Sequence, residues 1–179
     1  KTHAPQTETT ISYEYDLNGN RTKLIYPDST YITYEYDSLN RLMRIRDQSQ
    51  AQVATYFYDA LSRRTRLNLL NGAYITYTYD AVSNITKLTN VYKNYQSDAY
   101  TYTYDRTGNR LTKKTSALTP ETYSYDNIYQ LTNVSYPNAT TASYNYDSLG
   151  NRINATDNGV STNYTSNSLN QYTLVDTIA

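Results

Sequence analysis

The chain has 179 residues, enough for one domain or for a segment of a larger protein. Its 16 basic and 16 acidic residues cancel, so no net charge directs it to nucleic acid or to an anionic membrane, and neither is expected as a partner. The sequence has no cysteine, which excludes disulfides and thiolate metal sites, and it has no apolar run of the roughly 18 residues that a membrane span requires.

Tyrosine dominates the composition. There are 24 Tyr, against one Phe and no Trp, while Gly and Pro number 5 and 4. Tyr and Thr favour strands, and chains that stay disordered are poor in aromatic residues. We therefore expect a folded, β-rich protein whose packed surface is built from tyrosine. Residues 1–11 are expected to be a lead-in to this fold.

From residue 12 to residue 175 the chain repeats a Tyr-x-Tyr-Asp pattern about eight times, with a period near 21 residues. An eighth, degenerate copy starts at Tyr164 and has Asn167 in place of the aspartate. Residues 176–179 are expected to be a tail, cut from a longer chain or continuing into one. The seven repeat aspartates are Asp16, Asp37, Asp59, Asp80, Asp105, Asp126 and Asp147.

Each Tyr-x-Tyr segment predicts a half-buried strand with both rings on one face, because side chains alternate along a strand. The residue between the two tyrosines is polar in most copies, with Phe57 as the exception. We interpret the tyrosines as a packing ladder, in which the hydroxyl of the first tyrosine of each pair reaches a wet lumen or the surface, and a carbohydrate-stacking platform is the alternative. The ladder comprises Tyr13, Tyr15, Tyr34, Tyr36, Tyr77, Tyr79, Tyr102, Tyr104, Tyr123, Tyr125, Tyr144 and Tyr146.

The aspartate of each copy predicts the start of a turn, because its carboxylate can accept backbone N–H groups two residues on. The third residue after it is expected to adopt the positive φ that follows a type I turn in a hairpin, which suits glycine and asparagine. Serine takes this position twice, and Tyr129 in the sixth copy predicts a different turn. The residues that fit the rule are Gly19, Asn40, Gly108 and Gly150.

After each turn the chain alternates again, as in "RTKLIY", and a second turn signal such as "YPDST" or "YPNAT" closes the unit. Two strands and two turns in about 21 residues leave roughly 6 to 7 residues for each strand, which is a normal length. The sequence therefore predicts an all-β protein of repeated antiparallel β-hairpins. These hairpins are expected to form a continuous curved or spiralling strip.

The pattern Tyr-x-Tyr-Asp-x-x-Gly-Asn-Arg-Leu-Thr, found from about Ser12 to Val175, resembles the YD repeat of the Rhs/YD-repeat family. This family contains bacterial Rhs proteins, wall-associated and toxin-complex C proteins, and teneurins. The resemblance implies a shell or a β-solenoid-like fold, and in bacterial members a shell that wraps a C-terminal toxin domain. It implies a non-catalytic structural segment of a secreted or cell-surface bacterial protein, with an enclosed toxin as partner. The Pro/Asp/Gly-rich segment at which toxin-bearing members cleave themselves does not occur in this sequence.

A self-assembling extracellular fibre or adhesin is the alternative function, because the strand edges of an open strip can pair with other copies of the chain. Low charge together with strand propensity favours such stacking, and charged residues are few in the last third of the chain. After Asp126 they are Asp147, Arg152, Asp157 and Asp176.

A glycan-binding module is a weaker alternative. The spacing from Asp80 to Asp105 is 25 residues, so about four extra residues fall between Thr89 and Tyr100. They predict a longer loop, in which Tyr92 and Tyr95 are candidate contact residues for a partner such as a cell-surface glycan.

No catalytic residue, metal ligand or cofactor is expected. His3 is the single histidine. Equivalent aspartates lie two strands apart, about 9.6 Å, which is too far for one Ca²⁺ ion with its ligands at about 2.3–2.6 Å. Arginines at the turn exits are expected to lie over tyrosine rings or to pair with the turn aspartates. They are Arg21, Arg41, Arg64, Arg110 and Arg152.

Overall fold

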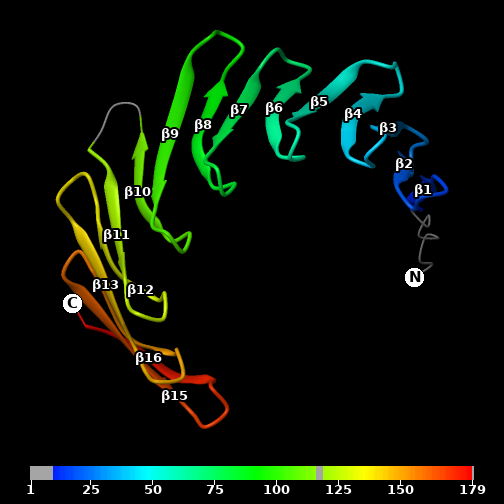
Figure 1. Ribbon diagram of the computed structural model, residues 1–179. Helices are drawn as coiled ribbons and strands as arrows, with labels where there is room; N and C mark the ends of the chain where they lie inside the picture. The colour runs from blue at the N-terminus through cyan, green and yellow to red at the C-terminus, as the bar shows by residue number, and fades with distance from the viewer. Residues whose placement is uncertain (1–9, 116–118, 179) are drawn as a thin grey trace, which may run out of the picture. The chain divides into compact units, whose positions relative to one another are not determined.

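The computed structural model describes residues 10–115 and 119–178, which form strands and tight turns (Figure 1). The strand order in the sheet is the order in the chain, and every described pairing is antiparallel. The predicted all-β architecture of antiparallel hairpins is therefore confirmed. The strands are β1 (Ser12–Tyr15), β2 (Arg21–Ile25), β3 (Tyr31–Tyr36), β4 (Leu42–Asp47), β5 (Gln52–Tyr58), β6 (Arg64–Leu69), β7 (Tyr74–Tyr79), β8 (Ile85–Val91), β9 (Ser97–Tyr104), β10 (Arg110–Thr115), β11 (Glu121–Tyr125), β12 (Leu131–Ser135), β13 (Thr141–Tyr146), β14 (Arg152–Asp157), β15 (Val160–Ser166) and β16 (Tyr172–Ile178).

The chain forms two compact units. The first runs to Thr78 and also includes Thr89–Ser97, and the second consists of Tyr79–Leu88 and the residues from Asp98 onward. Within the part of the chain that the structure describes, no helix is long and apolar enough to cross a membrane.

One class of turn, which we call the YD turn, begins at each repeat aspartate and at Asn167. In the first of them the N–H of Asp16 donates to the carbonyl of Asn20 at 2.9 Å, and the N–H of Gly19 donates to the carbonyl of Asp16 at 3.1 Å. All eight YD turns share this pair of bonds. The third residue has a positive φ in each of them, as a type I turn with a left-handed closing residue requires.

The expectation of a different turn at Tyr129 is wrong. The N–H of Tyr129 donates to the carbonyl of Asp126 at 3.1 Å, as in the other YD turns, and Tyr129 has a φ of 68°. A non-glycine residue in this region costs about 1–2 kcal/mol. The flanking strands β11 and β12 impose the turn geometry, and the Tyr129 side chain, which is 59% exposed, has room to accommodate it.

The longer loop expected between Thr89 and Tyr100 is also wrong. The N–H of Tyr92 donates to the carbonyl of Gln96 at 2.8 Å, and the N–H of Tyr95 donates to the carbonyl of Tyr92 at 2.9 Å, which closes a tight turn of the same kind. The extra residues lengthen the strands instead, because β8 has seven residues and β9 has eight. Strand pairing satisfies the backbone groups of the additional residues, which a loop would leave to solvent.

The strand registers give each unit two chemically different faces. We call the face that carries the Tyr-x-Tyr rings the tyrosine face, and the opposite one the polar face. On the tyrosine face aliphatic residues stand opposite the rings, as in the rows Tyr13–Leu24–Ile32 and Tyr123–Val134–Ala142. On the polar face the equivalent rows are Glu14–Lys23–Thr33 and Ser124–Asn133–Ser143.

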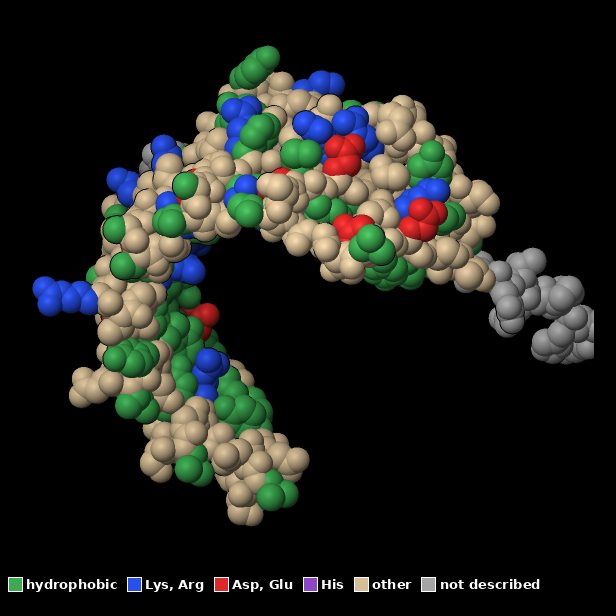
Figure 2. All heavy atoms as spheres, turned by 45° about the vertical axis from the view of Figure 1, so that its right-hand side comes forward, with side chains coloured by type: hydrophobic (Ala, Val, Ile, Leu, Met, Phe, Trp, Pro, Cys, Tyr) green, Lys and Arg blue, Asp and Glu red, His purple; other side chains and the backbone are tan. Residues whose placement is uncertain are grey.

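Little of the sheet is buried. Among the described residues the buried side chains are Ala54, Val134 and Ala142, all on the tyrosine face. Many larger apolar side chains stay exposed, and Figure 2 shows several of them on the surface in view. Within each unit the described strands form a single layer, so no second layer of these residues covers the apolar face. Bonds between neighbouring hairpins must therefore supply much of the cohesion.

Candidate functional site

The candidate site is the row of YD turns and the tyrosine rings beside it. The structure places in this row every turn residue that the sequence predicts. The carboxylate of each repeat aspartate accepts backbone N–H bonds from the residues two and four positions on. In the fifth turn, Asp105 Oδ1 accepts the N–H groups of Thr107 and Asn109, both at 2.9 Å, and Asp105 Oδ2 accepts Asn109 Nδ2 at 2.8 Å. Asn167 Oδ1 accepts the equivalent N–H bonds of Leu169 and Gln171 at 2.9 and 3.1 Å.

These bonds stabilise the ionised form of the aspartates. The pKa of Asp105 is lowered to about 2, chiefly by the hydrogen bond from the side chain of Asn109. Hydrogen bonds from the Thr107 hydroxyl and from backbone N–H groups lower it further. The pKa of Asp16, Asp37 and Asp147 is also lowered, chiefly by a hydrogen bond from the side chain four residues on.

We predict that the protein loses stability in acid because of these turns. A depressed folded-state pKa contributes stability that is complete above the unfolded value of 3.8 and is lost as the pH falls toward about 2. The urea midpoint should therefore fall steeply between about pH 4 and pH 2. Asp105→Asn keeps an acceptor but removes one titrating group, so its midpoint should fall less steeply over this range. An equal slope for both proteins would contradict the prediction.

Neighbouring hairpins pair by backbone bonds only up to a recurring point. In every described junction the ladder ends seven residues after one repeat aspartate and four residues before the next, as at Lys23↔Thr33 and Thr112↔Thr122. The other described junctions end at Arg44↔Thr55, Arg66↔Thr76, Asn133↔Ser143 and Asn154↔Asn163. Beyond this point, side chains rather than the backbone hold adjacent hairpins together.

The second tyrosine of the Tyr-x-Tyr pair makes one of these links, which we call the tyrosine latch. Its hydroxyl donates to the backbone carbonyl five residues after the preceding aspartate, as when Tyr58 donates to the carbonyl of Leu42 at 2.7 Å. The other described latches are Tyr36 to Arg21, Tyr104 to Ile85, Tyr125 to Arg110 and Tyr146 to Leu131, at 2.9 to 3.0 Å.

The eighth repeat lacks the latch tyrosine and has Ser166 in its place, whose hydroxyl oxygen is buried without a partner among the described residues. Tyr172 on β16 reaches the same part of the preceding hairpin, where its hydroxyl accepts the N–H of Arg152 at 3.0 Å. Its ring contacts that of Tyr164 at a centroid distance of 5.2 Å. A tyrosine on the outgoing strand thus partly replaces the missing latch.

Arginines at the turn exits lie over the tyrosine rings. The Arg21 guanidinium lies 4.5 Å from the ring centre of Tyr34 and 5.8 Å from that of Tyr13. Arg110 lies between Tyr102 and Tyr123 at 5.2 and 5.8 Å. Each such cation–π contact contributes about 0.5–1 kcal/mol at an exposed site. Arg64 and Arg152 contact Tyr56 and Tyr144, both at 4.7 Å.

Side chains four residues after the aspartate join successive YD turns. Asn20 Nδ2 donates to Asn40 Oδ1 at 3.1 Å, and Asn151 Nδ2 donates to Asn170 Oδ1 at 3.2 Å. In both pairs the acceptor is the third residue of the next turn. Where that residue is Gly150, Gln130 Nε2 would lie 3.1 Å from an added Cβ. The turns therefore approach closely when this position holds a small or planar polar residue.

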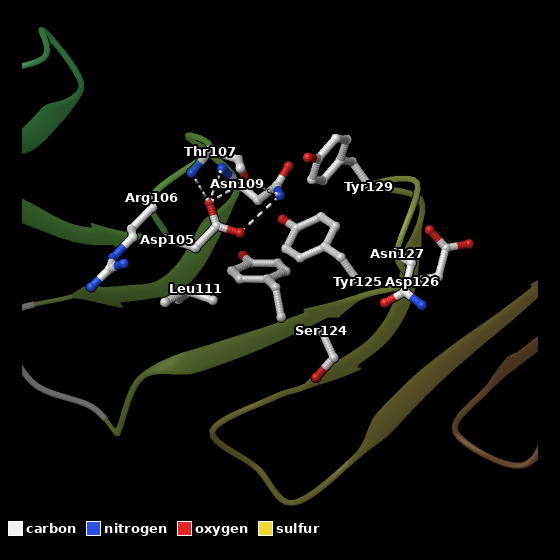
Figure 3. Close-up of a pocket in the computed structure, with 11 residues that line it drawn as sticks. Asp105, Arg106, Thr107, Asn109, Leu111, Ser124, Tyr125, Asp126, Asn127 and Tyr129 are labelled. Atoms are coloured by element: carbon white, nitrogen blue, oxygen red, sulfur yellow. Dashed lines mark hydrogen bonds between the residues drawn. The ribbon is translucent and has the colours of Figure 1, made fainter.

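Tyr129 occupies this position in the sixth turn, and a groove of about 560 Å³ lies between the fifth and sixth turns. This volume is within the range of ligand sites, about 300–1,000 Å³. In Figure 3 the rings of Tyr125 and Tyr129 are directed toward the turn that carries Asp105 and Asn109.

The wall of the groove continues into an ion pair on the tyrosine face. Lys113 Nζ donates to Glu121 Oε1 at 2.9 Å, and the Tyr123 hydroxyl donates to Glu121 Oε2 at 2.6 Å. Burial and this bond raise the pKa of Tyr123 to about 12. The Tyr123 hydroxyl therefore stays protonated at neutral pH and acts as a donor, not as a nucleophile.

The candidate contact residues Tyr92 and Tyr95 lie at the tip of the β8–β9 hairpin. Tyr95 is 88% exposed and has a φ of 63°, and Tyr92 is 46% exposed. Within the first unit, a hollow of about 600 Å³ is lined by Asn71, Ala73 and Tyr92–Asn94. No group of three or more His, Cys, Asp or Glu among the described residues could hold a metal ion, and His3 lies outside them.

The sequence interpretation missed the latch. A signal for it was present, since Phe would pack as well as Tyr on a half-buried face, yet the chain has 24 Tyr and one Phe. So strong a preference for the hydroxyl indicates a hydrogen bond at these positions.

Comparison with solved structures identifies the fold. The chain matches the Tc holotoxin pore of Photorhabdus luminescens with a TM-score of 0.76 and 18% identity, over 92% of this chain and 10% of the matched chain. It matches TcdB2–TccC3 without its hypervariable C-terminal region with a TM-score of 0.78 and 18% identity, over 93% of this chain and 10% of that one. The fold is the hairpin strip of the Rhs/YD-repeat type, and the chain spans about a tenth of the chains it matches. No protein-family model and no curated protein matches the sequence.

Proposed function

We propose that the chain is a wall segment of a larger secreted or surface-exposed bacterial YD-repeat protein, and that the complete wall encloses a C-terminal toxin domain. The observation that carries the proposal is the match of 93% of this chain to a portion of TcdB2–TccC3. The fold fits a structural role, because identical links between hairpins recur along the chain. Sheets built this way grow by adding hairpins, with each repeat contacting its neighbours.

The amphipathic sheet suits enclosure. The tyrosine face presents rings, aliphatic side chains and stacked guanidinium groups, while the polar face carries Thr, Ser, Asn and ion pairs such as Glu14–Lys23 at 3.3 Å. Neither face is covered by a second layer within the described residues. A wall with one apolar, aromatic face can contact an unfolded or partly folded segment without a specific site.

Limited proteolysis of the native polypeptide that carries this segment tests the proposal. The region C-terminal to the repeats should resist protease while the wall is intact. Replacing four latch tyrosines by Phe (Tyr36, Tyr58, Tyr125 and Tyr146) should open the wall and increase the rate of cleavage. Tyr144→Phe, whose hydroxyl makes no described hydrogen bond, should leave the rate unchanged. A C-terminal region that is cleaved as fast in the intact protein as in the four-Phe variant contradicts enclosure.

A second candidate function, a self-assembling extracellular fibre, rests on β16. This strand pairs with β15 through one edge, and all seven of its residues are exposed. Leu174 and Val175 stand on opposite faces and are 58% and 57% exposed. An apolar strand with one charge can pair with a further strand, and in this candidate function that strand belongs to another copy of the chain.

We predict that Val175→Lys abolishes any concentration-dependent association of the chain, because a lysine on an edge strand opposes edge-to-edge pairing. Sedimentation velocity over a range of protein concentrations measures this. The matched control is Leu149→Lys, which adds the same charge at a YD turn where Leu149 is 72% exposed. A loss of association in both variants would indicate a general charge effect rather than pairing through β16.

A further inference from the structure

We infer that the groove between the fifth and sixth YD turns is a binding site for the guanidinium group of an arginine, presented by an extended peptide segment. The repeats themselves supply the template, because an arginine of this chain occupies the equivalent space between the second and third turns. The groove residues concerned are Asp105, Asn109, Tyr125, Asp126 and Tyr129.

Arg41 shows how that space is filled. Its guanidinium carbon lies 4.5 Å from the ring centre of Tyr58, the latch tyrosine of the next repeat. Its Nε and Nη2 atoms both lie 2.7 Å from Asp37 Oδ2. Its Nη1 atom donates to Ser62 Oγ at 3.1 Å and to the carbonyl of Asp59 at 3.4 Å. One guanidinium thus joins two turns by stacking, an ion pair and backbone recognition.

The fifth and sixth turns have the same framework without the arginine. Asn109 is the counterpart of Arg41, and its short side chain bonds to Asp105 and to Thr107 within its own turn. Tyr125 is the counterpart of Tyr58 and makes the same latch to the preceding hairpin at 2.9 Å. The Tyr125 ring and the two turns are therefore in place. The Asn109 side chain, however, is three atoms shorter than that of Arg41 and does not cover them.

The junction that contains Asn109 also differs from those that contain Asn20 and Asn151, because no direct side-chain bond is described between its two turns. In the junctions that contain Asn20 or Asn151, the next turn offers an Asn as acceptor, and a direct bond joins the turns. In the sixth turn this position holds Tyr129, whose ring is 59% exposed. The ring is directed toward the fifth turn and adds a second aromatic surface beside Tyr125, as Figure 3 shows.

The polar groups of the groove suit a cation. In the third turn, the carbonyl of Asp59 accepts the N–H of Ser62 and also a bond from Arg41 Nη1. In the sixth turn, the carbonyl of Asp126 accepts the N–H of Tyr129 in the same way. Asp105 and Asp126 both line the groove, with the carboxylate of Asp105 facing the tyrosine rings and that of Asp126 directed away from Asp105 in Figure 3. Arg106 lines it too, but its side chain is directed away from the tyrosines in Figure 3. A guanidinium can donate to this carbonyl while stacked on Tyr125, whereas an ammonium group has no planar surface to stack.

The test is a titration of the 179-residue chain with the blocked tripeptide acetyl-Gly-Arg-Gly-amide, followed by ¹H–¹⁵N amide shifts. Saturable shifts are expected at residues 105–109 and 125–129. The same peptide with Lys in place of Arg should bind about two- to fivefold more weakly, because an ammonium keeps its attraction to the ring but lacks the planar stacking and the forked N–H donors of a guanidinium. Equal responses to the two peptides, or shifts spread over the whole chain, would overturn the inference.

Two variants make the test specific to the geometry. Asn109→Arg should fill the groove from within and abolish the response to the Arg peptide, with a thermal midpoint no lower than that of the parent chain. Tyr129→Ser should remove the second aromatic surface and let the two turns approach, so that the Arg peptide no longer shifts the amides of residues 125–129. Retention of full binding in Asn109→Arg or in Tyr129→Ser contradicts the inference.

Discussion

Ala142→Asp is expected to lower the free energy of unfolding by about 3 kcal/mol or more. Ala142 is 1% exposed on the tyrosine face of β13, and it stands opposite Val134 on one side and Asp157 on the other. An aspartate at this position would bury a carboxylate next to an aliphatic side chain and place it opposite a like charge, which is unfavourable across a strand pair. A urea unfolding curve at pH 7 measures the change.

Ser143→Asp is the matched control, because Ser143 is the next residue of the same strand and points to the polar face. It lies opposite Asn133 and Thr156 and is exposed. The substitution should cost less than about 1 kcal/mol, the span of strand propensities. Similar losses for the two variants would mean that the faces do not differ in burial, contrary to the described registers.

Loss of the latch hydroxyls should have a comparable effect when several are removed together. Tyr146→Phe takes one hydroxyl from the carbonyl of Leu131, a bond of 2.9 Å, and should cost about 1 kcal/mol because the carbonyl loses its partner. The variant with Phe at Tyr36, Tyr58, Tyr125 and Tyr146 should lose about 4 kcal/mol, because these sites lie in separate junctions and add nearly independently. Chemical denaturation measures both values.

Tyr144→Phe separates the latch from simple packing. Tyr144 lies on the same strand and face as Tyr146 and contacts the Arg152 guanidinium at 4.7 Å, but its hydroxyl has no described hydrogen bond. Because the ring and its stacking remain, the change should be within about 0.5 kcal/mol. An equal loss at the two positions would show that the hydroxyl bonds contribute nothing specific.

The latch and the guanidinium stacking both join adjacent hairpins beyond the point where the backbone ladder between them ends. Backbone pairing between hairpins stops before the YD turns, so the last residues of each incoming strand have no ladder partner in the preceding hairpin. Tyrosine suits this position because its ring covers the gap while its hydroxyl reaches a carbonyl. The ring also offers a surface on which the arginines at the turn exits stack.

The hairpin fold is determined locally, which is why the sequence alone predicts it. Strict Tyr-x-Tyr alternation assigns a face, and Asp16 with Gly19 specifies a turn through bonds that span at most four residues. Repetition of this unit near every 21 residues leaves few alternatives to a strip of hairpins. The predictions of a different turn at Tyr129 and of a longer loop in Thr89–Tyr100 were wrong, because pairing of the flanking strands outweighs the preference of single residues.

Only the tertiary structure decided how one hairpin is joined to the next. The bond from Tyr58 to Leu42 spans 16 residues, and it depends on where the ladder between β4 and β5 ends. The groove beside Tyr125 likewise arises because Asn109 and Tyr129, which belong to successive repeats, meet across a junction. A pattern within one repeat cannot specify such contacts, because they are set by the register between hairpins and by the size of side chains on both sides.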